Sequence, residues 1–312
     1  MGRRASGSPV SREPVGWVFN LDAEDELRRG GPHTPTQVTR ARVEGLLPLL
    51  GPLMQPQDEV VWPSARSSFH ARWGRTWCPT RWALEQLSRA GLRVPPAPSP
   101  AVLREVNHRR FAHALGQALP GARFVQNERE LLEALCDSRL LARVSSERNW
   151  LMKRPLGYAG RGRRKISSGE LNRTDRVWID AALRSGDGLQ VEPLVARELD
   201  CGLHGWLGAD GQLSLGQPTR QQIDASGQWL STERAAPTAL EPAEREQLQR
   251  EATATAQALR RAGYFGPFGL DAFRWRAPDG TVHFQPRCEL NARYSMGWAI
   301  GMGEFEVPTG AW

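Results

Sequence analysis

The sequence predicts an α/β N-terminal domain followed by two α+β lobes with antiparallel sheets. In the N-terminal part, short apolar runs alternate with a helical pattern, which is typical of an α/β layer. Four prolines within 95–100 favour an extended connector. Beyond it, strand-like runs follow one another in quick succession, as in antiparallel sheets. We therefore expect a flexible tail at 1–14, an N-terminal domain at 15–100, and lobes at 101–190 and 191–312.

The individual elements follow from apolar periodicity, helix caps and turn residues. In the N-terminal domain these patterns predict strands at 15–19, 59–62 and 92–94 and helices at 38–50 and 80–90. In the lobes they predict helices near 104–118, 128–136, 175–184 and 241–262, and strands near 123–125, 150–153, 188–191, 199–207, 212–215, 268–275 and 282–290. The last two strands are expected to be joined by the turn at 278–280.

Composition excludes several classes of protein. The net charge is +7, but arginine is spread along the chain without a zinc finger, basic zipper or aromatic RNA motif, so we do not expect nucleic acid as a partner. No window reaches the ~18 apolar residues of a membrane span, and the N-terminus lacks the apolar core of a signal peptide, so we expect no membrane partner and a cytoplasmic protein. The four cysteines form no CxxC pair and are expected to be free thiols.

The use of lysine is uneven. Of 41 basic residues only Lys153 and Lys165 are lysine, and both lie in one short segment. Where nearly all basic residues are arginine, a lysine can mark a position at which a slender ammonium fits and a planar guanidinium does not. Chance is the alternative explanation.

That segment also carries a glycine-rich element, in which Gly157, Gly160 and Gly162 follow Lys153 between two strand-like runs. The order GxxGxG matches neither a P-loop nor the Rossmann fingerprint. Glycine N–H groups without a neighbouring Cβ can approach phosphate oxygens closely. The alternative is a surface hairpin loop with solvated arginines.

A second element combines Asp271 on one predicted strand with Glu289, Asn291 and Arg293 on the next. Alternation places Glu289 and Asn291 on the same face of their strand. Two carboxylates and an amide oxygen suit Mg²⁺ together with phosphate oxygens, and Arg293 would lie beside a transferring phosphoryl group. A salt-bridged exposed face is the alternative.

In this order, Lys153 with its glycine loop, the run 191–195, Asp271 and the motif from Glu289 to Arg293 resemble the ATP-grasp ligases. The resemblance covers about 104–300, and the preceding domain resembles the N-terminal, pre-ATP-grasp domain of that family. It implies that ATP binds between two α+β lobes. It also implies that a carboxylate attacks the γ-phosphate to form an acylphosphate, from which an amine or another nucleophile displaces phosphate.

The resemblance also implies roles for single residues. Lys153 would contact the phosphates and act in catalysis together with Arg293. The other ATP contacts that it implies are Arg109 in place of a second lysine, Gly157, Tyr158, Gly160 and Gly162 in the loop, Glu192, Leu194 and Val195 at the adenine, and Glu198 or Asp200 at the ribose. The implied Mg²⁺ ligands are Asp271, Glu289 and Asn291.

These inferences lead to two hypotheses of different class. The first is an ATP-dependent carboxylate–amine, or carboxylate–thiol, ligase that releases ADP and phosphate, with ATP and Mg²⁺ as cofactors and a small-molecule or peptide carboxylate and an amine as partners. The second is a non-catalytic ATP-binding module that regulates or scaffolds a partner. A homodimer remains open, and the acceptor is not identified by any motif in the N-terminal domain or the loop expected at 216–230.

Overall fold

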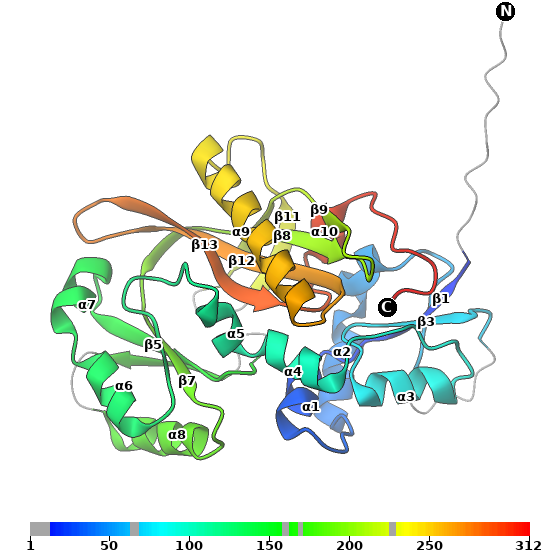
Figure 1. Ribbon diagram of the computed structural model, residues 1–312, viewed down its shortest axis with the longest axis horizontal. Helices are drawn as coiled ribbons and strands as arrows, with labels where there is room; N and C mark the ends of the chain where they lie inside the picture. The colour runs from blue at the N-terminus through cyan, green and yellow to red at the C-terminus, as the bar shows by residue number, and fades with distance from the viewer. Residues whose placement is uncertain (1–12, 63–68, 158–161, 168–170, 225–228) are drawn as a thin grey trace, which may run out of the picture.

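The computed structural model describes residues 13–62, 69–157, 162–167, 171–224 and 229–312. The expected tail at 1–14 therefore lies almost entirely outside the described residues. The chain forms three parts: an N-terminal domain, a central lobe and a C-terminal lobe built on the largest sheet (Figure 1). Among the described residues, no helix has the length and apolar character that crossing a membrane requires.

The N-terminal domain is an α/β layer, as predicted. Its parallel sheet has the order β2-β1-β3, which only crossover connections can produce. Its elements are β1 (Val15–Val18), α1 (Ala23–Arg29), α2 (Gln37–Leu50), the 3₁₀ turn η1 (Gly51–Leu53), β2 (Glu59–Val60), β3 (Trp73–Thr76) and α3 (Arg81–Arg89). The strand predicted at 92–94 is wrong in extent, because only Arg93 forms a bridge, to Trp73. The sequence pattern missed β3, whose residues are mostly polar or glycine.

The central lobe contains an antiparallel sheet of order β4-β7-β5-β6. Its elements are α4 (Pro100–Asn107), α5 (Arg109–Ala114), β4 (Arg123–Val125), α6 (Glu128–Leu135), α7 (Ser138–Val144), β5 (Asn149–Lys153), β6 (Arg163–Ser167), α8 (Arg173–Leu183) and β7 (Leu189–Pro193). The single helix predicted at 104–118 is wrong, because His108 is extended and its ring accepts from the Arg110 N–H to begin a second helix. Strand β7 runs across residue 190, where we expected a lobe boundary.

The C-terminal lobe is an antiparallel sheet of order β11-β10-β8-β12-β13, with β9 also paired to β8. Its elements are β8 (Ala196–Leu207), β9 (Leu213–Leu215), β10 (Thr219–Ile223), β11 (Trp229–Arg234), α9 (Pro242–Arg261), β12 (Gly266–Arg276), β13 (Val282–Asn291) and α10 (Trp298–Met302). The loop expected at 216–230 instead contains β10 and the start of β11. Both strands are rich in polar residues, so the sequence pattern did not indicate them. Long strands β8, β12 and β13 fix the positions of the side chains described below.

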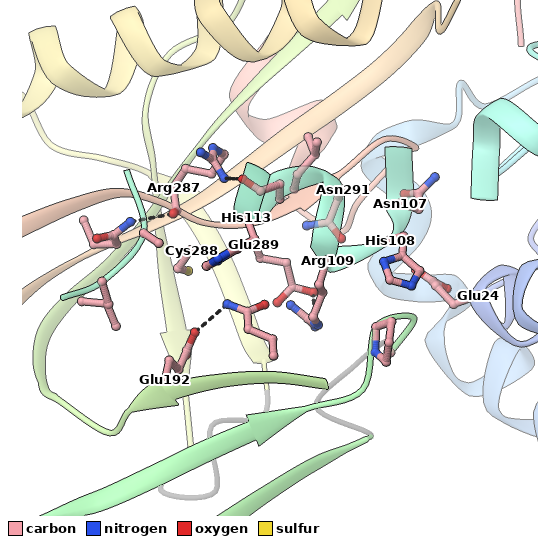
Figure 2. Close-up of a pocket in the computed structure, with 18 residues that line it drawn as sticks. Glu24, Asn107, His108, Arg109, His113, Glu192, Arg287, Cys288, Glu289 and Asn291 are labelled. Atoms are coloured by element: carbon pink, nitrogen blue, oxygen red, sulfur yellow. Dashed lines mark hydrogen bonds and ion pairs between the residues drawn. The ribbon is translucent and has the colours of Figure 1, made fainter. Parts of the chain in front are cut away.

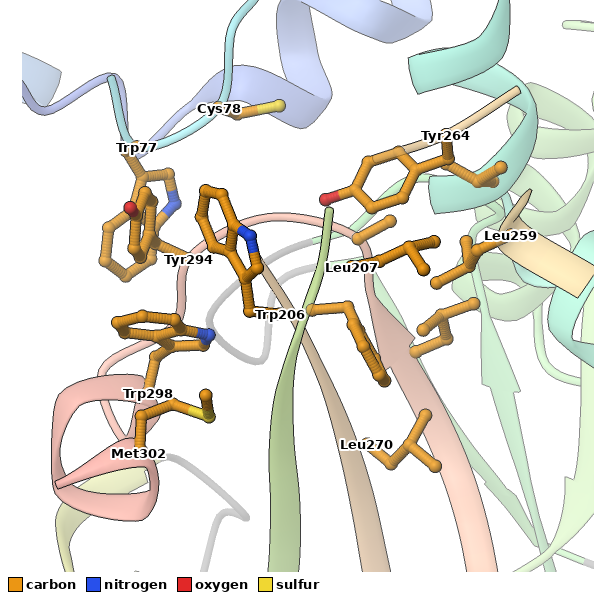
Figure 3. Packing of buried hydrophobic residues seen from close by; sticks show 14 of the residues in the cluster. Trp77, Cys78, Trp206, Leu207, Leu259, Tyr264, Leu270, Tyr294, Trp298 and Met302 are labelled. Atoms are coloured by element: carbon orange, nitrogen blue, oxygen red, sulfur yellow. The ribbon is translucent and has the colours of Figure 1, made fainter. Parts of the chain in front are cut away.

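A single apolar cluster joins the N-terminal domain to the C-terminal lobe (Figure 3). Trp77 from the first domain belongs to the same cluster as Trp206, Tyr294 and Trp298 of the lobe. The rings of Tyr294 and Trp298 lie 4.9 Å apart, edge to face, an arrangement that adds to the free energy of burial. The four cysteines are free, as predicted.

Candidate functional site

A cavity of about 920 Å³ lies where the three parts of the molecule meet. We call it the central cavity. Its polar end is formed by Lys153, Asp271, Glu289 and Asn291, together with Asp200 and Gln221. Its other side, which we call the α2 wall, is formed by Val38, Thr39, Arg42, Val43, Leu46 and Leu49. Sites for small molecules occupy about 300–1,000 Å³, so this volume lies in the range of ligand-binding sites.

The predicted metal ligands converge at the polar end. Strands β12 and β13 are antiparallel, and their register sets Asp271 opposite Glu289. The Asn291 side-chain amide lies 3.3 Å from Asp271 Oδ2, and the other oxygen of Asp271 accepts from the Gln221 amide at 2.7 Å. Gln221 comes from β10, and no pattern in the sequence had indicated it. Its position next to Asp271 depends on the pairing of β10 with β8.

Glu289 is held by arginine side chains. Arg109 donates to it at 2.9 Å, and Arg163 lies 3.6 Å from its other oxygen. Figure 2 shows the Arg109 guanidinium beside the Glu289 carboxylate. Arg109 also donates to the Arg154 carbonyl and does not line the central cavity. The structure thus places Arg109 as a support for Glu289, whereas we expected a phosphate contact.

The two carboxylates of this cluster have pKa values shifted in opposite directions. Burial, and next to it the charge of Glu289, raise the pKa of Asp271 to about 6. Burial acts against ionisation of Glu289 too, but Arg109 and Arg163 outweigh it and lower its pKa to about 2. The described residues contain no cluster of three or more His, Cys, Asp or Glu that could hold a metal. Two carboxylates with the Asn291 amide oxygen still fit Mg²⁺, which takes its remaining ligands from phosphate and water.

Lys153 and Lys165 occupy very different environments. Lys153 is 2% exposed, and its Nζ lies 2.5 Å from Glu192 Oε1. Burial lowers the pKa of Lys153, and the charge of Glu192 opposes this shift. Lys165 pairs with Glu147 at 2.5 Å, but half of its side chain is exposed at the rim of the cavity. A buried ammonium that faces the cavity can contact phosphate without competition from bulk water.

The glycine-rich loop is described only at its two ends. Tyr158 and Gly160 lie outside the described residues, and Gly157 lines a small polar pocket beside the central cavity. Gly162 has φ of 74°, and its carbonyl accepts from the Arg154 N–H at 2.8 Å. A Cβ at Gly162 would lie 3.2 Å from Arg154 Cβ, so both conformation and space favour glycine at this position.

The expected adenine contacts lie at the end of β7, which contains Glu192, and directly after it, at Leu194 and Val195. The backbone of Leu194 is already used, because its N–H donates to Asn149 and its carbonyl accepts from the Ser145 hydroxyl. Within the part of the chain that the structure describes, no backbone hydrogen bond engages Val195, which lines the cavity. The backbone N–H and carbonyl of Val195 are therefore available to a ligand. The side chain of Glu192, by contrast, pairs with Lys153.

The structure separates the two candidates for the ribose. Asp200 lines the central cavity and accepts from Arg197 at 2.9 Å. Glu198 is exposed and pairs with Arg276 at 2.5 Å, and it does not line the cavity. Strict alternation would place both residues on the same face of β8, but the register with β12 shifts there. Leu199 pairs with Arg274 and Arg197 with Trp275, so Glu198 lies at an irregularity that interrupts the alternation. Asp200 is therefore the candidate that the geometry retains.

Arg293 is anchored to the N-terminal domain. Its Nε donates to Glu24 of α1 at 2.6 Å, and its guanidinium lies 5.6 Å from the Trp77 ring. The remaining terminal nitrogen donates to the Tyr294 carbonyl. Arg293 still lines the central cavity, beside Asn291. Sequence analysis had not singled out Glu24, which lies in an acidic helix start directly after β1.

Solved structures with the ATP-grasp fold are similar over most of the chain, so the chain has this fold. A biotin carboxylase from Campylobacter jejuni, in complex with β,γ-ATP, has a TM-score of 0.53 and 13% identity over 96% of this chain and 72% of its own. N5-carboxyaminoimidazole ribonucleotide synthetase from Thermus thermophilus has a TM-score of 0.51 and 16% identity over 90% and 71%.

D-alanyl-alanine synthetase A from Vibrio cholerae has a TM-score of 0.50 and 12% identity, over 90% of this chain and 89% of its own. No protein-family model matches the sequence, and the search of curated proteins gives no match either. At these identities the similarity shows the fold, and the predicted fold class is confirmed.

Proposed function

We propose that the protein is an ATP-dependent ligase that activates a carboxylate as an acylphosphate, passes the acyl group to an amine or thiol, and releases ADP and phosphate. The observation that carries this proposal is the convergence of Asp271, Glu289 and Asn291 opposite the buried Lys153 in one cavity. The similar solved structures with this fold support it.

The cavity offers a place for each part of ATP. The apolar side chains of Leu151, Leu194 and Val195 line the side where the adenine would lie, and the backbone of Val195 can pair with its edge. Asp200 is placed to accept from a ribose hydroxyl. Lys153 would then face the phosphates, and its present partner Glu192 would remain beside it.

Asp271, Glu289 and the Asn291 amide would hold Mg²⁺, which when bound neutralises charge on the phosphate oxygens. Gln221 keeps one oxygen of Asp271 in place by its hydrogen bond. Arg109 and Arg163 keep Glu289 ionised. These contacts fix the ligand oxygens before the nucleotide arrives, so little reorganisation accompanies phosphoryl transfer.

The proposed chemistry has two steps. An oxygen of the carboxylate substrate attacks the γ-phosphorus, the bond to the bridging oxygen of ADP breaks, and an acylphosphate forms. The nucleophile then attacks the acyl carbon and loses a proton, and phosphate leaves with the carboxylate oxygen that had attacked the γ-phosphorus. Arg293, fixed by Glu24, lines the same cavity and would stabilise charge that develops on the transferred group.

The test is a screen of phosphate release with ATP, Mg²⁺ and pools of carboxylic acids combined with pools of amines and thiols. We expect ADP and phosphate in equal amounts, dependent on at least one acid pool. ATP binding without turnover in any pool would instead support the non-catalytic ATP-binding module. Absence of ATP binding would overturn both.

A further inference from the structure

The α2 wall has a composition that the nucleotide site does not require. Residues Val38, Arg42, Leu46 and Leu49 lie three or four positions apart on α2 and all line the central cavity. This spacing places them on one side of the helix. That side does not complete a core, since Val38 is 72% exposed and Leu49 is 47% exposed.

Exposed apolar groups are concentrated in this cavity. Among the described residues, seven large hydrophobic side chains are exposed, and Val38, Leu49 and Leu230 of this set line it. Leu230, which is 55% exposed, comes from β11 and belongs to the C-terminal lobe. Apolar surface from two separate parts of the chain therefore faces one cavity, where a ligand could remove it from water.

One cation interrupts this apolar surface. Arg42 lies between Val38 and Leu46 on the same side of α2. No ion pair joins Arg42 to any other residue in the described ranges, whereas Arg293 in the same cavity is neutralised by Glu24. An arginine without an acidic partner, beside apolar side chains, suits a carboxylate attached to an apolar body.

We propose that one of the two substrates joined by this protein is an amphipathic carboxylate, with its apolar body against Val38, Leu49 and Leu230 and a carboxylate on Arg42. This inference rests on the proposed ligase function and specifies a substrate class for it. Two kinds of substrate have an apolar body and a carboxylate: an apolar carboxylic acid that is activated, and an apolar amino acid that supplies the amine.

Binding is tested on the full chain by calorimetry, with Mg²⁺ and a non-hydrolysable ATP analogue present. The probes are leucine, phenylalanine, tryptophan and 3-phenylpropionate. Matched probes without the carboxylate are isoamylamine, phenethylamine and tryptamine for the three amino acids and 3-phenylpropan-1-ol for 3-phenylpropionate. Matched probes without the apolar body are alanine for the amino acids and acetate for 3-phenylpropionate. We expect at least one apolar carboxylate to bind at least about tenfold more tightly than its two matched probes, from the apolar area and the charged hydrogen bond involved.

Two variants locate this binding, each with a control. Val38→Asn should weaken it about fivefold, whereas Val177→Asn, at a residue that is 60% exposed on α8, should leave it unchanged. Arg42→Gln should weaken binding of the carboxylate probe about tenfold and leave binding of the matched amine unchanged. Arg129→Gln on α6 is its control. Because the exposed side chains contribute little to folding, the variants should keep the wild-type unfolding temperature.

The outcomes separate this inference from the proposed function. If the ATP analogue binds and every apolar carboxylate binds no better than alanine or acetate, the substrate class is wrong and the ligase proposal survives. Equal binding of an apolar amine and its carboxylate would also overturn the role of Arg42. If the analogue itself does not bind, the proposed function fails. Hydroxamate formation from 3-phenylpropionate with ATP and hydroxylamine would show that the bound acid is activated. Amide formation on the phenylalanine nitrogen, with ATP and a carboxylate from the acid pools as acyl donor, would show that the bound amino acid is the acceptor.

Discussion

The polar end of the central cavity and the α2 wall are organised in opposite ways. At the polar end each charged group has a partner: Lys153 pairs with Glu192, Glu289 with Arg109, and Asp271 accepts from Gln221. On the α2 wall, Val38 and Leu49 face open space. In the proposed ligase the polar end would therefore be preorganised for groups of fixed charge and geometry, such as phosphate and a metal, whereas the α2 wall would select by apolar area. Changes at the polar end should accordingly affect every substrate, and changes on the wall only some.

The largest effect is expected for Glu289→Gln. One of the two carboxylates at the proposed metal site loses its charge with little change in volume, so turnover should fall about a thousandfold or more. The free energy of unfolding should also decrease by about 2 kcal/mol, because Arg109 keeps a hydrogen bond but loses its counter-charge. Phosphate release and urea unfolding measure the two effects. Glu198→Gln, outside the cavity, is the control, and wild-type turnover in Glu289→Gln would remove Glu289 from the site.

Acid should destabilise the fold through His204, a buried residue that lines the cavity. Burial lowers the pKa of His204 to about 4. As the pH falls, the unfolded state binds the proton first. The contribution of neutral His204 to the free energy of unfolding is therefore fully present above about pH 6.5, and about 3 kcal/mol is lost as the pH falls to about 4. Urea unfolding across this range should show the slope, and His204→Met should reduce it. Part of the slope should remain, because burial also lowers the pKa of His108 to about 4. An unchanged slope in His204→Met would contradict this assignment.

The two lysines test whether the polar end requires an ammonium. Lys153→Arg should weaken ATP binding about thirtyfold although it keeps the charge, because the buried slot beside Glu192 does not fit a planar guanidinium. Lys165→Arg should change affinity less than twofold, since Lys165 is half exposed. Calorimetry measures both, and circular dichroism checks folding. Greater damage from Lys165→Arg would mean that the phosphate contact belongs to Lys165.

A smaller effect is expected at the ribose. Asp200→Asn should weaken ATP binding about fivefold, because a charged hydrogen-bond acceptor in the cavity becomes neutral. Glu198→Gln should leave affinity unchanged, because Glu198 pairs with Arg276 outside the cavity. The 2′-deoxy analogue of ATP should bind both Asp200→Asn and the wild type with similar affinity. If Glu198→Gln is the weaker binder, the assignment made from the cavity lining is wrong.

The sequence predicted those features of the site that depend on residues close together in the chain, and missed those that depend on contacts between distant segments. The alternation of Glu289 and Asn291, and the position of Asp271 on the preceding strand, follow from spacing within neighbouring strands. Glu24 could not be linked to Arg293, because 269 positions separate them and only the packing of the N-terminal domain brings them together.

Gln221 and the α2 wall were not predicted, because each depends on the tertiary structure. Strand β10 is polar, and its strand character comes from pairing with β8, which also carries Gln221 to Asp271. The periodicity of α2 was visible, but apolar side chains that line a cavity have the same spacing as those that line a core. Only their exposure in the structure separates the two.

The most direct test follows oxygen from the carboxylate to the phosphate. A carboxylate substrate found in the phosphate-release screen is labelled with ¹⁸O in both oxygens, and the released phosphate is analysed by mass spectrometry after turnover with ATP and Mg²⁺. Activation through an acylphosphate transfers one labelled oxygen, so phosphate should gain about 2 Da. Unlabelled phosphate would show hydrolysis of ATP without carboxylate activation, and formation of AMP would show adenylation. Either result would contradict phosphoryl transfer at the polar end of the cavity.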